Sequence, residues 1–249
     1  MEDSTTNTRF ERILRMLHEV RRQGLTCFGS NQHRFRLNRC LSESAISKFE
    51  VKHRVRLPED YREFLLRVGN GGAGPYYGLL PLEKWADAMM EDHPDYLARP
   101  SPLRPDMPAD IRWEETLQCP WEELFQGTLA LSHHGCAYYA LLVVTGSFRG
   151  RVVYINLDCC GAPYFVLDED FVSWYERWLD ELLWGYDMTW FGFGLPGREE
   201  DMVATVRRGR ETERMHAEAM YTLIRISKLR PDTIHVVRES LTHADPKVR

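Results

Sequence analysis

The sequence predicts an α+β protein of 249 residues, on three observations. Apolar side chains recur at helical spacing in residues 10–20, 61–68 and 171–183. Short apolar segments bounded by glycine occupy residues 128–167, as expected of consecutive strands. A glycine-rich turn at residues 69–74 separates one of the helices from an extended segment. Runs of helices and runs of strands that are segregated along a chain are typical of the α+β class.

Two helices are expected before the glycine turn. The first spans about residues 8–22 and ends at Gly24, because glycine readily terminates a helix. The second begins at Leu41-Ser42 and places Ile46 and Phe49 on one face. The buried stripe of the first helix is predicted to be Phe10, Ile13, Leu14, Leu17 and Val20.

Residues 57–82 are predicted to form a helix, a turn and a short strand. Pro58 suits the first helical position, and Glu59 and Asp60 favour the positive end of the helix dipole. The strand is expected to follow Pro75 and to end at Pro81. The predicted core stripe of this helix is Tyr61, Phe64, Leu65 and Val68.

The next segments alternate between irregular and regular structure. A brief helix is expected at residues 83–90, followed by a proline-rich acidic insertion at about residues 92–127 with a helical turn near 111–116. After the insertion, strands are predicted at 128–131, 137–144, 151–157 and 163–167. A helix over residues 171–183 is expected to close this domain, to be capped by Asp168 or Asp170 and to end at Gly185.

The composition changes from Trp190 onward, which predicts a second unit. Residues 1–185 form the predicted α+β domain, residues 186–197 a linker, and residues 198–249 a helical extension. Helices are expected at 213–229 and 233–242, on either side of Arg230-Pro231-Asp232. The extension is expected to contribute little to the folding of the first domain.

Charge and cysteine content exclude several classes of protein. Residues 57–197 hold 9 Lys/Arg against 22 Asp/Glu, a balance of −13 that repels nucleic acid and attracts cationic partners. A solvated acidic surface without a partner is the competing interpretation. No apolar run is long enough to span a membrane, and no secretory signal is recognisable, so a cytoplasmic location is expected. The six cysteines lack disulfide-framework spacing and are expected to be reduced.

His133, His134 and Cys136 form the strongest candidate for chemistry. Adjacent residues on a strand point in divergent directions, so neither the His133-His134 pair nor the Cys159-Cys160 pair is well placed to bind one metal ion. No metal site and no cofactor are therefore expected. A Cys136 nucleophile would need a base and an orienting group nearby, which sequence neighbours do not establish. Neither a nucleophile elbow nor a phosphate-binding loop occurs. The sequence therefore favours a protein that is not an enzyme.

Several spaced elements surround the glycine turn: Ile46, Phe49, Glu50, Leu57-Pro58-x-Asp60-Tyr61-x-x-Phe64-Leu65, Asn70-Gly71-Gly72 and Gly78-Leu79-Leu80-Pro81-Leu82. In this combination they resemble the SUKH superfamily. The resemblance covers about residues 10–183 and implies a mixed sheet flanked by helices in a non-enzymatic binding domain, often a bacterial immunity protein.

The last residues, Asp245-Pro246-x-Val248-Arg249, resemble the start of a HEAT repeat. A helical hairpin with a chance match is the alternative.

These observations lead to one functional hypothesis and two rivals. The protein is expected to neutralise a toxin domain with a basic surface, through an acidic surface that carries aromatic residues. The first rival is an intracellular scaffold or adaptor, and the second is a hydrolase that uses the His133–Cys136 region. The predicted contact residues are Tyr76, Tyr77, Glu83, Trp85, Asp87, Trp113, Glu114 and Glu115.

Overall fold

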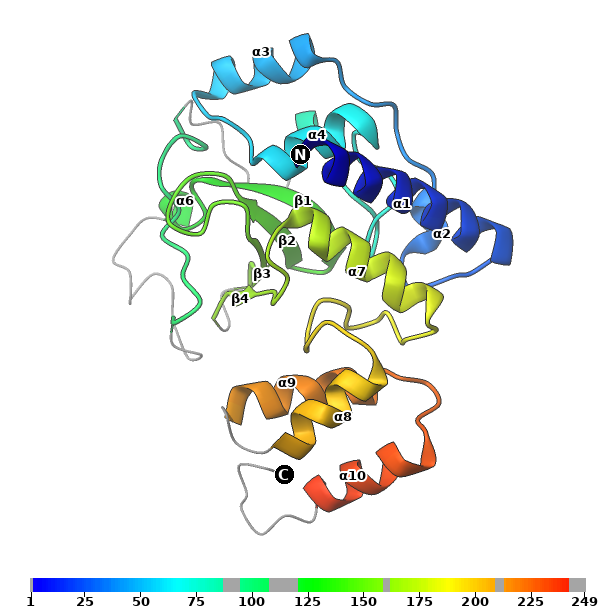
Figure 1. Ribbon diagram of the computed structural model, residues 1–249. Coiled ribbons are helices and arrows are strands. Elements are labelled where there is room, and N and C mark those ends of the chain that lie inside the picture. Colours follow the sequence, from blue (N-terminus) through cyan, green and yellow to red (C-terminus); the bar gives the residue numbers. More distant parts are fainter. Residues whose placement is uncertain (1, 87–94, 108–120, 159–161, 209–212, 242–249) are drawn as a thin grey trace.

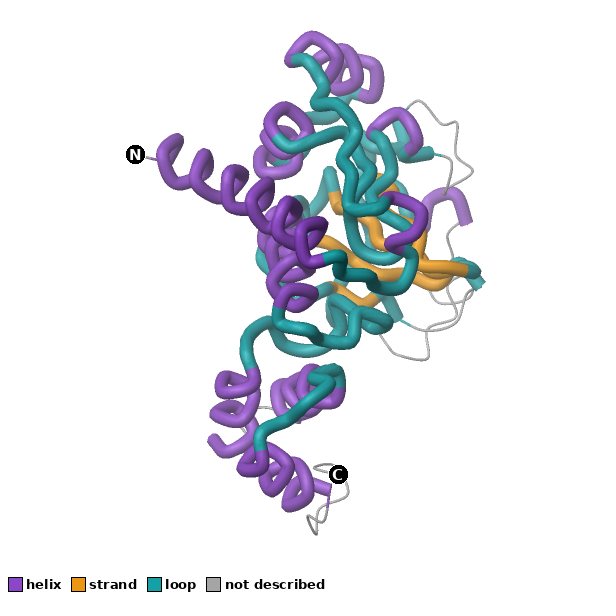
Figure 2. The backbone as a smooth tube through the Cα atoms, turned by 90° about the vertical axis from the view of Figure 1, so that its right-hand side faces the viewer, coloured by secondary structure: helices purple, strands orange, loops and turns teal. Residues whose placement is uncertain are grey.

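A four-stranded sheet covered on one face by helices is the centre of the molecule. The computed structural model describes residues 2–86, 95–107, 121–158, 162–208 and 213–241. The long helices α1 and α7 lie side by side across the sheet, and α8 to α10 form a separate layer beyond the end of α7 (Figures 1 and 2). The predicted α+β class is confirmed. No described helix combines the length and the hydropathy that crossing a bilayer requires.

The sheet is built from strands that follow one another in the chain. Its order is β1-β2-β3-β4, and all three pairings are antiparallel, whereas the family resemblance implied a mixed sheet. Residues 141–144 are fully buried, and β2, to which most of them belong, is a central strand paired with β1 on one side and β3 on the other. The strands are β1 (Thr128–Gly135), β2 (Tyr138–Val143), β3 (Val152–Asn156) and β4 (Tyr164–Phe165).

The helices of the first part follow the apolar stripes in the sequence. Helix α4 buries Tyr61, Phe64 and Leu65 against α7, and Asp170 caps α7 by accepting a hydrogen bond from the Ser173 N–H at 2.6 Å. Leu14 was predicted to be buried but is 41% exposed, because it lies at the edge of the α1 stripe. The helices are α1 (Glu2–Gln23), α2 (Ser30–His33), α3 (Glu43–His53), α4 (Glu59–Arg67), α6 (Trp121–Leu124) and α7 (Phe171–Leu183).

Two predicted elements between α4 and β1 differ from the structure. The brief helix expected at 83–90 is a single 3-10 turn, η1 (Leu82–Lys84), within the described residues. The strand expected to end at Pro81 is reduced to isolated bridges of Leu79 with Gly72 and Ser132, because tight glycine turns limit how far the backbones pair. Part of the predicted insertion packs into the core through Tyr96, Leu97, Leu103, Met107 and Phe125. The helical turn expected near 111–116 lies outside the described residues.

The described C-terminal residues form three helices, and apolar side chains from these helices and from Leu195 make a second cluster. Helices α8 (Glu199–Arg208), α9 (Glu213–Ile224) and α10 (Pro231–Leu241) surround this cluster. Its buried members are Leu195, Met202, Val206, Ala219, Leu223 and Val236. The segment 186–197 packs closely, since Tyr186, Met188 and Phe191 belong to the main core.

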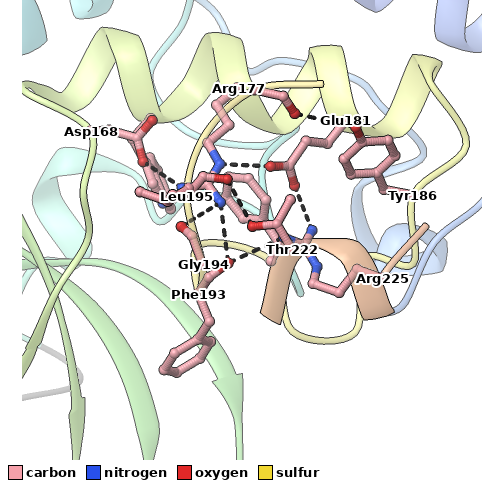
Figure 3. A network of polar contacts seen from close by, with 12 residues as sticks. Asp168, Arg177, Glu181, Tyr186, Phe193, Gly194, Leu195, Thr222 and Arg225 are labelled. Atoms are coloured by element: carbon pink, nitrogen blue, oxygen red, sulfur yellow. Dashed lines mark hydrogen bonds and ion pairs between the residues drawn. The ribbon is translucent and has the colours of Figure 1, made fainter. Parts of the chain in front are cut away.

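Buried ion pairs join the two clusters and fix the segment between them (Figure 3). The Arg177 guanidinium donates to Asp168 at 3.1 Å, to Glu181 at 2.7 Å, and to the carbonyls of Phe193 and Gly194. Arg225 of the C-terminal part pairs with the other oxygen of Glu181 and donates to the carbonyl of Asp187 at 3.0 Å. Burial alone would lower the pKa of Arg177, but Glu181 and Asp168 raise it. We call these residues, Asp168, Arg177, Glu181 and Arg225, the ionic junction.

The buried imidazole of His33 makes stability dependent on pH. Burial lowers the pKa of His33 to about 4, and its Nδ1 accepts the Phe35 N–H at 3.0 Å. Between about pH 6.5 and pH 4 this histidine is protonated in the unfolded chain but not in the folded one. The contribution of His33 to the free energy of unfolding is therefore fully present above pH 6.5 and falls as the pH drops toward 4. We expect His33 to account for about 2–3 kcal/mol of this loss.

Urea melts at pH 7.5, 6 and 5 test this expectation. His33→Asn keeps an acceptor near the Nδ1 position and should give a flatter dependence of the free energy of unfolding on pH. A constant difference between the variant and the natural sequence at all three pH values would contradict it.

Candidate functional site

The predicted contact residues divide into exposed, buried and undescribed groups. Tyr77 and Glu83 are exposed, as a contact surface requires. Tyr76 and Trp85 are only 6% exposed each, so the prediction that they face a partner needs correction. The Tyr76 hydroxyl donates to the Phe191 carbonyl at 2.8 Å, and the Trp85 ring packs between His53 and Tyr96. Asp87, Trp113, Glu114 and Glu115 lie outside the described residues.

A partly open cavity of about 300 Å³ lies where Tyr76 and Tyr77 meet the turn between β1 and β2. Glu83 is not among its lining residues. Seven of the eleven lining residues are Phe, Tyr or Trp, a predominantly aromatic lining that is typical of binding sites. The lining residues are Phe28, Tyr76, Tyr77, His134, Gly135, Cys136, Tyr138, Tyr154, Thr189, Trp190 and Phe193.

The exposed aromatic residues of the protein gather at this cavity. Phe28, Tyr77, Tyr138 and Trp190 are 46%, 38%, 46% and 53% exposed. They are the four exposed aromatic residues among the side chains that the structure describes, and all four line the cavity. Exposed aromatic groups in one patch mark an interaction site more often than scattered ones. We call these four residues the aromatic rim.

Five separate segments deliver the lining residues, and close backbone contacts hold them together. A Cβ atom at Gly29 would collide with the carbonyl of Tyr76, so glycine is required for the Phe28 loop to lie against the turn. Tyr76 and Cys136 adopt positive φ values of 56° and 49°, and the backbone turns at each of these two residues beside the cavity. The ionic junction holds the carbonyls of Asp187 and Phe193 and so fixes the segment that carries Trp190.

The histidines at this site do not form a catalytic arrangement. His134 stacks on Tyr76 with ring centroids 3.7 Å apart, and burial lowers its pKa well below the usual value. Its Nε2 lies 3.1 Å from the Oγ of Ser132, which is completely buried and therefore inaccessible to a substrate. The His133 Nε2 contacts the backbone carbonyl of Cys136 at 2.8 Å, not its thiol. Among the described residues, no three His, Cys, Asp or Glu side chains are placed to hold a metal ion.

Sequence reasoning missed most of this cavity. Phe28, Tyr138, Trp190 and Phe193 come from three segments that show no common spacing, and residues 186–197 were interpreted as a linker. One signal was available: Trp190-Phe191-Gly192-Phe193-Gly194 alternates aromatic residues with glycine, which is unusual for a flexible linker.

The fold and the cavity define an α+β domain with an aromatic surface suited to binding. Residues 40–177 match the SMI1/KNR4 family (SUKH-1), and the chain belongs to this family. Its members are immunity-protein-like domains, generally without catalytic activity. Comparisons with curated proteins and with solved structures found no match.

Proposed function

We propose that the protein is a bacterial immunity protein, located in the cytoplasm, that binds and neutralises a toxin domain without catalysis. The observation that carries this proposal is the convergence of the whole aromatic rim on one cavity in a SUKH-1 chain. Aromatic side chains on a rigid support contribute most of the binding energy in many protein interfaces. The excess of acidic residues in 57–197 favours a basic partner.

The contact surface proposed here keeps Tyr77 and replaces the two buried aromatics. Phe28, Tyr138 and Trp190 take the place of Tyr76 and Trp85 at the centre of the interface. The predicted acidic contacts, Glu83, Asp87, Glu114 and Glu115, act as steering charges, which speed association and lose effect as salt screens them.

Binding of the toxin domain encoded by the adjacent gene tests this function. We expect Tyr77→Ala and Tyr138→Ala each to weaken binding at least about 30-fold, the size expected for interface hot spots. Both side chains are exposed, so the melting temperature should change little. Ile224→Ala is the matched control, because Ile224 is an exposed apolar residue on α9, away from the cavity.

A second function, that of an adaptor, is favoured by one observation on the C-terminal helices. Met215, Ile224 and Ile234 are exposed apolar residues on α9 and α10. In this proposal residues 198–249 are a HEAT-like unit joined to the domain 1–185 through the segment 186–197, and the second apolar cluster supports such a division. If Ile224→Ala abolishes partner binding and the tyrosine variants do not, the adaptor replaces the immunity protein.

A further inference from the structure

The aromatic cavity has the character of a site for an organic cation. We propose that it holds an arginine side chain of the protein partner. The identity of the partner rests on the proposed function, whereas the preference for a cation follows from the cavity alone.

The lining contains many aromatic rings and no Lys or Arg that would repel a cation. Seven of the eleven lining residues are Phe, Tyr or Trp, and none is Lys, Arg, Asp or Glu. The depressed pKa of His134 keeps its imidazole neutral at pH 7. Aromatic rings carry negative potential on their faces and attract cations placed over them. A cavity that binds an apolar side chain could equally well be lined by Leu, Ile, Val or Met. None of these four residue types lines this cavity, which favours a cation over an apolar side chain.

The exposed charge nearest in sequence to the lining residues is negative. Asp187 is the only Asp, Glu, Lys or Arg within two residues in sequence of any lining residue. Its carboxylate is exposed and accepts the backbone N–H of Thr189, a lining residue, at 2.9 Å. Hydrogen bonds from Thr189 lower the pKa of Asp187, so it is ionised at neutral pH. Arg177 and Arg225, which both donate to the carbonyl of Phe193, are buried and paired with the carboxylates of Asp168 and Glu181.

Arginine fits this environment better than lysine. The guanidinium group is planar, stacks on aromatic rings and is more weakly hydrated than an ammonium group. It therefore loses less solvation on entering a cavity whose lining contains no carboxylate. The cavity of about 300 Å³ is at the lower end of ligand sites, the size suited to a single side chain.

A pair of near-isosteric ligands tests the proposal on the full chain. N-acetyl-arginine amide and the neutral N-acetyl-citrulline amide are titrated in parallel by ligand-observed NMR. We expect saturable binding of the arginine ligand, about five- to tenfold tighter than that of citrulline. In Trp190→Leu the affinities for the two ligands should become nearly equal, because leucine keeps apolar volume but has no aromatic ring. Trp190→Phe should retain part of the preference for the arginine ligand. Asp187→Asn should weaken arginine binding and leave citrulline binding unchanged.

Trp184→Leu provides the matched control, because Trp184 is a half-buried tryptophan that does not line the cavity. It should leave the ratio unchanged. Equal binding of the two ligands, or binding of neither, would overturn the proposal while leaving the toxin-binding function standing. A ratio that survives in Trp190→Leu would also overturn it. Conversely, an arginine preference in a protein that fails to bind the toxin would overturn only the proposed function.

Discussion

Glu181→Ala should destabilise the protein by about 3–5 kcal/mol, the loss expected when one partner of a buried ion pair is removed. The Glu181 carboxylate is fully buried and bonds to both Arg177 and Arg225. Without it, the two buried guanidinium groups retain, among the described residues, only the Asp168 carboxylate and backbone carbonyls as hydrogen-bond partners. Arginine does not lose its proton in a protein, so neither cation escapes by neutralisation. A urea melt of the full chain measures this loss.

Two further variants separate the ionic effect from a general loss of packing. Arg225→Met should cost less than Glu181→Ala, because Glu181 keeps its bond to Arg177 at 2.7 Å. Glu11→Ala removes an exposed ion pair with Arg15 on α1 and should change stability by less than about 1 kcal/mol. If Glu181→Ala costs no more than Glu11→Ala, the junction does not hold the C-terminal helices to the sheet domain.

The same junction connects stability with the candidate site. Arg177 and Arg225 both donate to the carbonyl of Phe193, which lines the aromatic cavity. Loss of the junction therefore releases the segment that positions Trp190. We infer that the C-terminal helices support the cavity, whereas the sequence suggested an extension of little consequence for the first domain.

Much of the fold could be predicted because local patterns and tertiary packing agree. The spacing of Tyr61, Phe64 and Leu65 identifies the buried face of α4, and the apolar run 141–144 identifies a central strand. Leu14 has the same spacing as its neighbours in α1 and is nevertheless half exposed. Periodicity gives the centre of a buried face, but the packed neighbour determines where that face ends.

The candidate site could be predicted only in small part. Tyr76 and Tyr77 are adjacent and chemically identical, yet one packs on His134 and the other faces solvent. That difference depends on partners far along the chain, because Tyr76 stacks on His134 and donates to the carbonyl of Phe191. The ionic junction was missed for a related reason. Arg177 and Glu181 are four residues apart within an apolar helix, a pattern that equally well describes a surface pair.

Phe64→Ala should destabilise the protein by about 3–5 kcal/mol, the range for removing a buried aromatic ring. Phe64 is completely buried, and its ring makes edge contacts with Phe171 and Tyr175 of α7 at centroid distances of 5.0 and 4.9 Å. Its removal leaves a cavity between α4 and α7, which the surrounding rings cannot fill without leaving their own contacts.

Leu14→Ala is the matched control for this variant, because Leu14 belongs to a predicted stripe but is 41% exposed. It should lose about 1 kcal/mol or less, since little apolar area is returned to water. Urea melts of both variants compare the two losses directly. Equal losses would mean that α4 does not pack as tightly on α7 as the ring contacts indicate. A loss confined to Phe64→Ala would establish the contact of α4 with α7 as the centre of the core.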